Sequence, residues 1–353
     1  HDDETGEIRE ILAAAKKAGV TAVIATDQAA IMAAREAGLE VHLSTQLNIS
    51  NSEALKFYSQ WADVAVLSRE LNLQQVRKVY DIILRDDIRG PGGDPVRLEM
   101  FIHGALCMAI SGKCYLSLHE NNASANRGNC YQICRRSYIV TDKETGHELE
   151  IDNEFIMSPK DLCTIRFLDQ IINAGARVLK IEGRARSPEY VKTVSECYCE
   201  AVESIIDGSF GDAKTEGWMT RLSTVFNRGF WDGYYLGQKL GEWSTTYGSA
   251  ATKRKIYLGR GTNYFSKLSV AEIKLETGDL STGDVLIFTG PTTGITEHTV
   301  SELRDEATRP AETVVKGALC SVHLPFQVRR SDKVFKWVTA SALKPNSACD
   351  TWQ

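Results

Sequence analysis

The chain has 353 residues, of which 43% are hydrophobic and 25% charged, an ordinary composition for a globular protein with a large core. Its formal net charge of −5 excludes nucleic-acid binding through a global basic charge, so any RNA contact must come from local patches. Nine cysteines are an odd number for a disulfide framework, and no apolar run is long enough to cross a membrane. With no secretory signal at the start of this sequence, we expect a cytoplasmic protein with reduced cysteines and no membrane partner.

Helix and strand patterns alternate through the first half of the chain. Helices are predicted at residues 7–18, from Asp27 to Gly38, from Asn51 onward and at 72–85. Apolar strands are predicted at residues 21–25, 40–44, 63–67, 96–103 and 178–182. A helix at 159–174, begun by Ser158 and Pro159, precedes the fifth strand, and another runs from Pro188 to about Ile206. This alternation predicts βαβ units and a parallel sheet.

The character of the sequence changes after residue 208. Residues 209–250 are rich in aromatic residues and glycine, and we expect a connector there. From residue 251 onward, short β runs with turn signals follow one another, among them 270–275, 282–288 and 318–324. We therefore predict three parts: an α/β domain over 1–208, the connector over 209–250 and a small all-β barrel domain over 251–353.

Four of the nine cysteines lie close together, separated by gaps of six, fifteen and three residues: Cys107, Cys114, Cys130 and Cys134. Four thiolates at this spacing indicate a shared metal site, because iron–sulfur clusters are held by four cysteines and thiolates select soft metals. Two disulfides, four unrelated buried thiols and a zinc site are the alternatives, although a tight zinc-type pair occurs only once. Cys163, near the predicted start of a helix, is the substitute ligand if one of the four is not used.

Polar side chains gather where the predicted strands end, which in α/β barrels is the end that carries the site. The residues concerned are Gln46, Arg69, Glu70, Glu99, His103, Lys180, Glu182, Arg184 and Arg186. Lys180 and Glu182 share one face of their strand, and charges facing a barrel interior are unfavourable unless they are paired or liganded. Arginines here are suited to clamp a carboxylated small molecule, since the guanidinium fork matches a carboxylate. A plain ion pair between Arg69 and Glu70 is an equally good interpretation.

Several separate motifs carry a family resemblance. The pattern Glu-x-Phe-x-x-Gly-x-x-x-Cys, six residues and Cys-x-x-Ser is matched from Glu99 to Ser117, and residues 157–162, 179–190 and 226–237 match as well. Over nearly its whole length the chain resembles the collagenase-like peptidases of unclassified-type family thirty-two. The resemblance implies a TIM-type (β/α) barrel. Only five strands are predicted here, so we expect a barrel that is incomplete at its N-terminal side, with an open doubly wound sheet as the rival.

The resemblance implies more than one function. The family name implies a peptidase, for which the sequence offers Cys107 with His103 and no marked third group. Members of another branch hydroxylate uridine in tRNA or cytidine in ribosomal RNA, with prephenate implicated as the source of the hydroxyl. The cysteine spacing fits the ligands of a 4Fe–4S cluster in that branch, and the β domain looks most like its tRNA-uridine members. The hypothesis is an iron–sulfur enzyme that hydroxylates a tRNA uridine with an electron-transfer partner, and a non-catalytic partner subunit is the third alternative.

The hypothesis assigns roles to the polar residues. Glu70, Glu99, His103 or Glu182 is expected to move protons. Arg69, Arg184 and Arg186 are expected to grip a carboxylated donor such as prephenate, with Gln46 and Lys180 in the same substrate-binding group. Arg136, beside the last cysteine, is suited to contact RNA phosphate.

Overall fold

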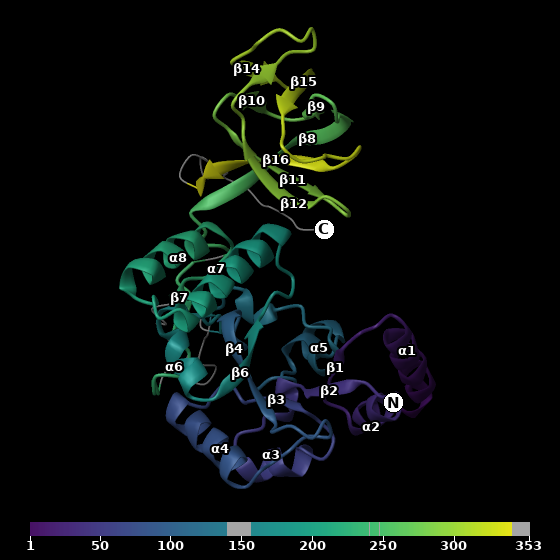
Figure 1. Ribbon diagram of the computed structural model, residues 1–353, viewed down its shortest axis with the longest axis vertical. Coiled ribbons are helices and arrows are strands. Elements are labelled where there is room, and N and C mark those ends of the chain that lie inside the picture. Colours follow the sequence, from purple (N-terminus) through teal and green to yellow (C-terminus); the bar gives the residue numbers. More distant parts are fainter. Residues whose placement is uncertain (140–156, 240, 247, 341–353) are drawn as a thin grey trace. The chain divides into compact units, whose positions relative to one another are not determined.

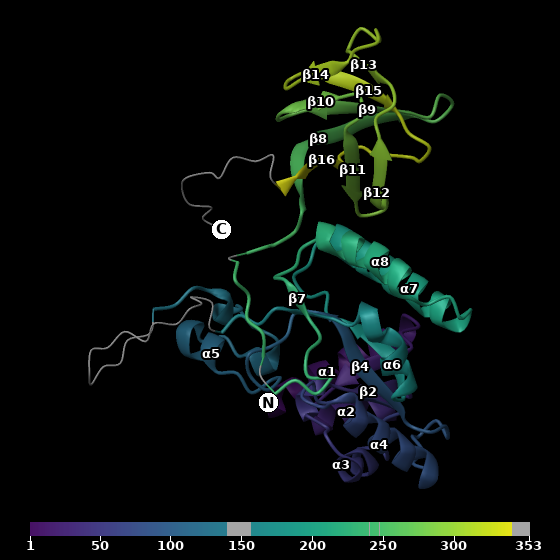
Figure 2. The ribbon, with the colours of Figure 1, turned by 90° about the vertical axis from the view of Figure 1, so that its left-hand side faces the viewer.

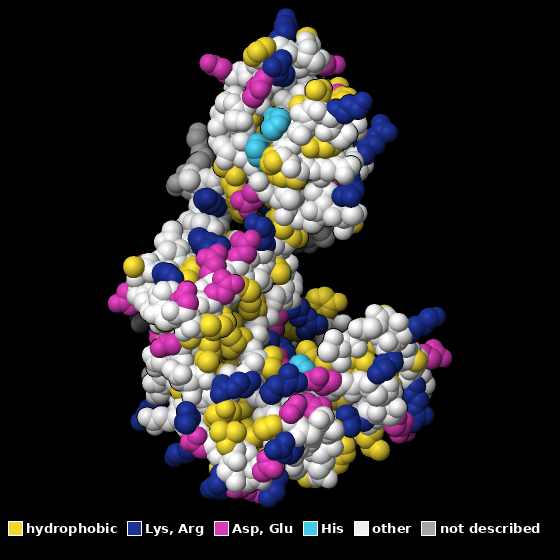
Figure 3. All heavy atoms as spheres, in the orientation of Figure 1, with side chains coloured by type: hydrophobic (Ala, Val, Ile, Leu, Met, Phe, Trp, Pro, Cys, Tyr) yellow, Lys and Arg dark blue, Asp and Glu magenta, His cyan; other side chains and the backbone are white. Residues whose placement is uncertain are grey.

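The computed structural model describes residues 1–139, 157–239, 241–246 and 248–340. The chain forms two compact units, which are treated separately below. The first consists of His1–Arg184, Cys197–Met219 and Asn227–Ala250, and the second of Ala185–Glu196, Thr220–Phe226 and Ala251–Gln353 (Figure 1). None of the described helices combines the length and the apolar character that crossing a membrane requires. Basic and acidic side chains are interspersed over the face seen in Figure 3, without a large field of one sign.

The first unit combines helices with one sheet. Its helices are α1 (Thr5–Lys17), α2 (Gln28–Glu36), α3 (Ser52–Tyr58), α4 (Leu73–Arg85), α5 (Leu116–Asn121), α6 (Leu168–Asn173) and parts of α7 (Pro188–Ile206) and α8 (Asp212–Thr224). Its strands are β1 (Ala22–Ala25), β2 (Glu40–Leu43), β3 (Val64–Val66), β4 (Arg97–Gly104), β5 (Asp161–Cys163), β6 (Ala176–Ile181) and β7 (Phe230–Trp231). Short 3-10 helices lie at Asp2–Glu4, Thr45–Leu47, Ala125–Arg127, Ile133–Arg135 and Ile165–Phe167.

Strands β1, β2, β3, β4 and β6 are parallel neighbours in chain order (labelled in Figure 1; Figure 2 shows β2 and β4 from another side). A doubly wound sheet reverses its strand order at a switch point, and this sheet does not. Strand β5 runs antiparallel to the end of β4, and β7 is parallel to β5. Among the described strands β1 pairs only with β2, so the sheet is open and no closed barrel is formed. The N-terminally incomplete TIM-type barrel therefore stays a prediction.

The two faces of this sheet differ in polarity, because side chains alternate along each strand. One face carries the fully buried Val41, Ala65 and Leu98. The pairing register places Glu99 on the other face, beside residues of β3 and β6. Phe101 and Lys180 are partners on that same face. The sheet thus has an apolar face that packs into the core and a polar face that carries charged groups.

The five predicted strands of this unit are confirmed as β1, β2, β3, β4 and β6, whereas the helix predicted at 159–174 is wrong. That segment forms β5, a 3-10 turn and the short helix α6. The Ser158–Pro159 pair resembles a helix start, but residues 161–163 pair with both β4 and β7, and this tertiary pairing overrides the local signal. The predicted connector over 209–250 contains two elements that were not expected, α8 and β7.

Gly175, between α6 and β6, offers a test of this packing. Its φ is +113°, and an added Cβ would stand 2.3 Å from Cγ of Tyr80. Gly175→Ala is therefore expected to lower the free energy of unfolding by about 3 kcal/mol, through backbone strain and overpacking. Gly217→Ala, inside α8 with nothing within 4 Å of the new Cβ, should instead raise it by about 0.5–1 kcal/mol. Urea unfolding of both variants checks the opposite signs, and equal effects would contradict the packing.

The continuous part of the second unit is an all-β structure. Its strands are β8 (Lys253–Phe265), β9 (Val270–Leu275), β10 (Asp279–Ser281), β11 (Val285–Gly290), β12 (Gly294–Thr299), β13 (Leu303–Arg304), β14 (Thr313–Val315), β15 (Leu319–His323) and β16 (Lys333–Thr339). Seven of them form one sheet in the order β12-β11-β16-β8-β9-β15-β13. In the part of the chain that is described, the two edge strands β12 and β13 do not pair with each other, so the predicted small barrel is not closed. Strands β10 and β14 form a separate two-stranded ribbon instead of joining those edges.

Candidate active site around the cysteine loop

The loop that follows β4, residues 105–136, is called the cysteine loop below. Arg135 ties its two ends together: its guanidinium donates to the carbonyl oxygen of Leu106 and, at 2.8 Å, to that of Pro159. In the middle of the loop, the N–H of Tyr131 donates to the hydroxyl of Ser117 at 3.0 Å. These contacts shape the loop without a regular element longer than one or two turns. Arg135 is therefore occupied by the loop itself.

The four cysteines of this loop are free thiols, so the pair of disulfides considered above is not formed. Cys107 and Cys130 are exposed, and Cys114 and Cys134 are half-buried. Burial raises the pKa of the Cys134 thiol, Arg135 opposes that rise, and the other three cysteines add to it. Electrostatic effects of this kind act over short distances, so the other three sulfurs lie near that of Cys134.

Four thiols are a donor set that a zinc ion and a four-iron cluster both take. Within the described residues, no three His, Cys, Asp or Glu side chains are placed to hold one metal ion. A tetrahedral zinc site with Zn–S bonds of about 2.3 Å would hold its sulfurs roughly 3.8 Å apart. That tight arrangement is not found among the described residues, and the four free thiols are the donor set of a four-iron cluster.

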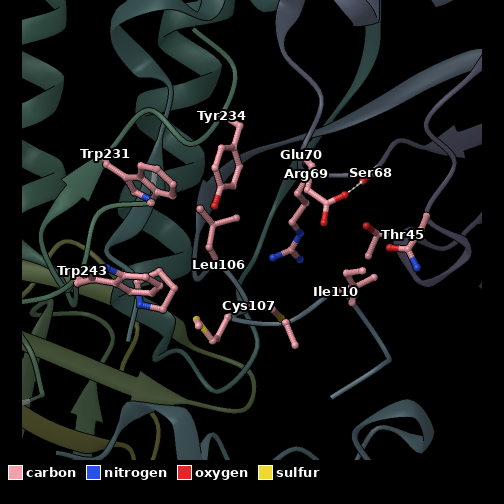
Figure 4. Close-up of a pocket in the computed structure, with 16 residues that line it drawn as sticks. Thr45, Ser68, Arg69, Glu70, Leu106, Cys107, Ile110, Trp231, Tyr234 and Trp243 are labelled. Carbon is pink, nitrogen blue, oxygen red and sulfur yellow. Dashed lines mark hydrogen bonds between the residues drawn. The ribbon is translucent and has the colours of Figure 1, made fainter. Parts of the chain in front are cut away.

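A cavity of about 150 Å³ adjoins Cys107. Figure 4 shows the rings of Trp231, Tyr234 and Trp243 on one side of it, and polar residues that follow β2 and β3 on the other. The polar side consists of Thr45, Asn48, Ser68, Arg69 and Glu70. The cavity thus has an aromatic wall and a polar wall, with a cysteine of the loop between them.

Arg69 and Glu70 do not form an ion pair among the described residues, which removes the plain interpretation considered for them. The Arg69 guanidinium lies over the ring of Phe101, with Cζ 3.8 Å from the ring centroid, and one nitrogen donates to the carbonyl oxygen of Ala105 at 3.2 Å. Glu70 instead accepts a hydrogen bond from the Ser68 hydroxyl at 2.9 Å. Both charged groups therefore remain available at the cavity wall.

Glu99 lies at the centre of an ionic network on the polar face of the sheet. Its side chain is 5% exposed, and it accepts a hydrogen bond from Lys180 Nζ at 2.7 Å. Nδ1 of His42 lies 3.3 Å from the other carboxylate oxygen, and Nε2 of the same ring lies 3.3 Å from Glu40. Burial alone would raise the pKa of Glu99, but the contacts with His42 and Lys180 outweigh it and hold the pKa below its usual value. Glu99 is therefore a carboxylate at neutral pH.

His103 and Cys163 face each other in the pairing of β4 with β5. Both are buried, and His103 Nδ1 lies 3.3 Å from the Tyr198 hydroxyl. The Cys163 sulfur lies 3.7 Å from that of Met219, and burial raises the pKa of its thiol to about 11. Cys163 is thus a protonated thiol inside the core, and it is not among the cysteines that act on Cys134.

Other residues predicted for the site hold the cysteine loop from the strand ends. Gln46 donates to the carbonyl oxygen of Asn126 at 3.4 Å, and the Arg184 guanidinium donates to that of Gly128. Glu182 accepts the backbone N–H of Arg184 at 2.8 Å. Gln46 and Arg184 therefore support the loop, Glu182 holds the backbone of Arg184, and Arg184 is engaged rather than open to a donor.

Two of the predicted arginines lie apart from this arrangement. Arg186 belongs to the second unit, where its guanidinium stacks on Phe226 with Cζ 4.1 Å from the ring centroid. Arg136 is exposed after the last cysteine of the loop. The structure thus brings Arg69 and Glu70 to the cavity and Glu99 and Lys180 to the network, and it does not gather the arginines into one clamp.

The sequence interpretation missed two groups. His42 has no motif around it, although its alternation with Glu40 along a strand of the same predicted sheet as Glu99 is a usable signal. The aromatic residues 231, 234 and 243 were assigned to a connector, and nothing local indicates that they face Arg69.

Comparisons with known proteins identify relatives of this chain. The model of Peptidase family U32 matches residues 1–245. A collagenase of Porphyromonas gingivalis is 57% identical over 337 residues, which cover 96% of this chain and 81% of that protein. A tRNA hydroxylation protein of Bacillus subtilis is 29% identical over 347 residues, covering 94% and 79%. A 23S rRNA 5-hydroxycytidine synthase of Escherichia coli is 33% identical over 249 residues, covering 69% and 36%.

These relatives include both collagenases and RNA hydroxylation proteins by name. The family match spans the sheet, the cysteine loop and the aromatic wall, and it explains the motifs recognised in the sequence. The chain therefore belongs to peptidase family U32, the unclassified-type family thirty-two.

Proposed function

We propose that this protein is an iron–sulfur-dependent RNA hydroxylase that acts on a uridine of tRNA. The observation that carries the proposal is the effect of three further cysteine thiols on that of Cys134, one of which, Cys107, also borders a ring-sized cavity. The names of the Bacillus subtilis and Escherichia coli relatives support RNA hydroxylation as the reaction class. A site that places a redox centre beside a substrate cavity is what such a reaction needs.

Cys107, Cys114, Cys130 and Cys134 would hold a 4Fe–4S cluster, each sulfur binding one iron. When bound, the cluster supplies electron transfer or an iron that accepts a substrate oxygen. Arg135 lies beside Cys134 and lowers the pKa of that thiol, which favours the thiolate that metal binding requires. Because burial raises the same pKa, cluster assembly should release a proton from Cys134.

Hydroxylation replaces a ring C–H by C–OH, which is a two-electron oxidation of the base. A co-substrate must supply the oxygen and a partner must take up the electrons, so the carboxylated donor such as prephenate and the electron-transfer partner remain part of the proposal. Glu70, exposed at the cavity wall, is suited to accept the ring proton. Glu99 and His42 form a second carboxylate–imidazole pair on the polar face.

A peptidase is the second candidate, because the Porphyromonas gingivalis relative that is 57% identical is named a collagenase. A thiol peptidase needs a thiolate beside an imidazole. The cysteine that pairs with His103 is Cys163, whose thiol stays protonated at neutral pH because burial raises its pKa to about 11. This geometry supports a peptidase less well than a hydroxylase.

One set of measurements tests the proposal. The protein is purified without oxygen, and its absorption spectrum, iron and sulfide are measured. About four irons and four sulfides per chain are expected. In parallel, nucleosides of tRNA from a deletion strain are analysed by mass spectrometry, and loss of a hydroxylated uridine is expected. An iron-free protein that digests denatured collagen, with tRNA unchanged in the deletion strain, would contradict the proposal and favour the peptidase.

A further inference from the structure

The cavity beside Cys107 contains three buried polar atoms that have no hydrogen-bond partner among the described residues. They are Oγ1 of Thr45, Nε of Arg69 and Nε1 of Trp231. Buried polar groups of native proteins are nearly always satisfied by protein, water or a ligand. Three such groups around one cavity are therefore open to water or to a ligand that offers acceptors to two N–H groups and a partner to one hydroxyl.

The size and the walls of the cavity limit what that molecule is. Its volume of about 150 Å³ equals that of an engineered cavity that takes up a single benzene ring. Trp231 and Tyr234 meet edge to face, with centroids 5.3 Å apart and planes at 78°, and Trp243 completes the aromatic wall. Such a wall stacks planar rings. One six-membered planar ring fits, and a two-ring purine does not.

The charge of the walls favours a neutral ring over an acid. The cavity is lined by one cation, Arg69, and one anion, Glu70, so an entering dicarboxylate would meet repulsion as well as attraction. A neutral ring that carries both donors and acceptors complements a wall of this kind. Uracil has two carbonyl oxygens for the two N–H donors and one ring N–H for the hydroxyl of Thr45.

We propose that this cavity takes up a single uracil base that has left its stack in the RNA. Nε–H of Arg69 and Nε1–H of Trp231 donate to the two carbonyl oxygens, Thr45 accepts the ring N–H, and the aromatic wall stacks on the ring. An enzyme that acts on a base atom must take the base out of its stack. The inference rests on the proposed function and deepens it: it names the place where the base binds, assigns Arg69 to the base rather than to the acidic donor, and adds Thr45 and the aromatic wall as binding residues.

Binding of short RNA to the full chain tests the inference. The probes are labelled five-nucleotide RNAs with a central uridine, cytidine or adenosine between adenosines, followed by fluorescence anisotropy. The wild type is expected to prefer the uridine probe. Trp231→Phe, which removes the N–H donor and replaces the indole by a smaller aromatic ring, should weaken uridine binding about 3- to 10-fold and leave adenosine binding unchanged. Trp243→Ala should weaken it about 10-fold or more through lost stacking.

Matched variants separate this effect from general damage. Trp61→Phe changes a tryptophan that packs on Phe57, outside the cavity, and should leave binding unchanged. Arg69→Lys keeps the charge, loses Nε–H and should cost as much as Trp231→Phe. Arg77→Lys is the matched control for Arg69→Lys, because Arg77 is exposed and pairs with Asp81 on α4. This variant should bind the uridine probe like the wild type.

Three results would overturn the inference: equal binding of the three probes, a Trp231→Phe variant that binds like the wild type, and displacement of the uridine probe by prephenate that becomes stronger in Glu70→Gln. The last result would assign the cavity to the acidic donor. These outcomes are separate from the iron measurement. If the protein contains iron and hydroxylates tRNA but fails the binding test, only the uracil assignment is wrong. If it contains no iron but passes the binding test, only the proposed function is wrong.

Discussion

Cys134→Ser is expected to remove the iron–sulfur cluster and, with it, RNA hydroxylation, while the protein stays folded. Cys134 is a half-buried member of the group and the other three cysteines act on its thiol, so its loss takes away one of the four proposed ligands. Iron and sulfide per chain should fall by at least about tenfold, since even supporting residues of metal sites carry effects of that size. The hydroxylated nucleoside should disappear from tRNA of a deletion strain complemented with this variant.

Cys199→Ser is the matched control, because Cys199 is an exposed free thiol on α7, away from the cysteine loop. It should retain iron, sulfide and the modified nucleoside, and circular dichroism should show that both variants fold. A Cys134→Ser protein with full iron content would remove the cluster assignment. A variant that loses its iron and still supports full modification would favour the third alternative, a non-catalytic partner subunit.

Glu99→Gln is expected to lower the free energy of unfolding at neutral pH by about 3 kcal/mol. Removing one member of a buried ion pair typically costs about 3–5 kcal/mol, because the other charge is left without its partner. The lower end applies here, since Lys180 and His42 are each 21% exposed and water screens them in part. Asp81→Asn, which breaks the exposed pair with Arg77 on α4, is the control and should cost less than about 0.5 kcal/mol.

The same pair predicts a pH dependence. The pKa of Glu99 is lowered in the folded protein relative to its ordinary value of 4.5, so the folded state favours the carboxylate. The stabilisation is therefore complete above the unfolded pKa and is lost as the pH falls through the lower folded pKa. Urea unfolding at pH values above and below 4.5 should show the wild type losing its advantage over Glu99→Gln in acid. A difference that stays constant across this range would contradict the role given to the carboxylate.

Local patterns were sufficient for five strands of the first unit and for recognising the cysteine loop. The strands confirmed as β1 to β4 and β6 are short apolar runs between capped helices, and such runs depend only on neighbours within a few residues. The four cysteines from Cys107 to Cys134 likewise fall within one loop, so their spacing could be recognised from the sequence. The all-β character after residue 251 follows from turn signals at regular intervals.

Tertiary pairing decided what the local patterns could not. Residues 159–174 carry a helix signal, yet residues 161–163 pair with the end of β4 and join the sheet. Strand β7 then pairs with these residues. That pairing brings Trp231 to the cavity that Arg69 and Cys107 also line, although these three residues come from widely separated parts of the chain. In the same way, only the register of β2 to β4 shows that His42 faces Glu99.

The sequence by itself thus determined which residues carry reactive groups and which segments become strands or helices, because both depend on composition and short-range periodicity. The tertiary structure alone decided which of those groups meet. Hydrogen bonds between two strands fix their register, and the register decides which side chains become neighbours. The residues that set the register lie far apart in the chain, so local patterns do not reveal it. The aromatic wall beside the cysteine loop and the ionic network of Glu99 are two such consequences.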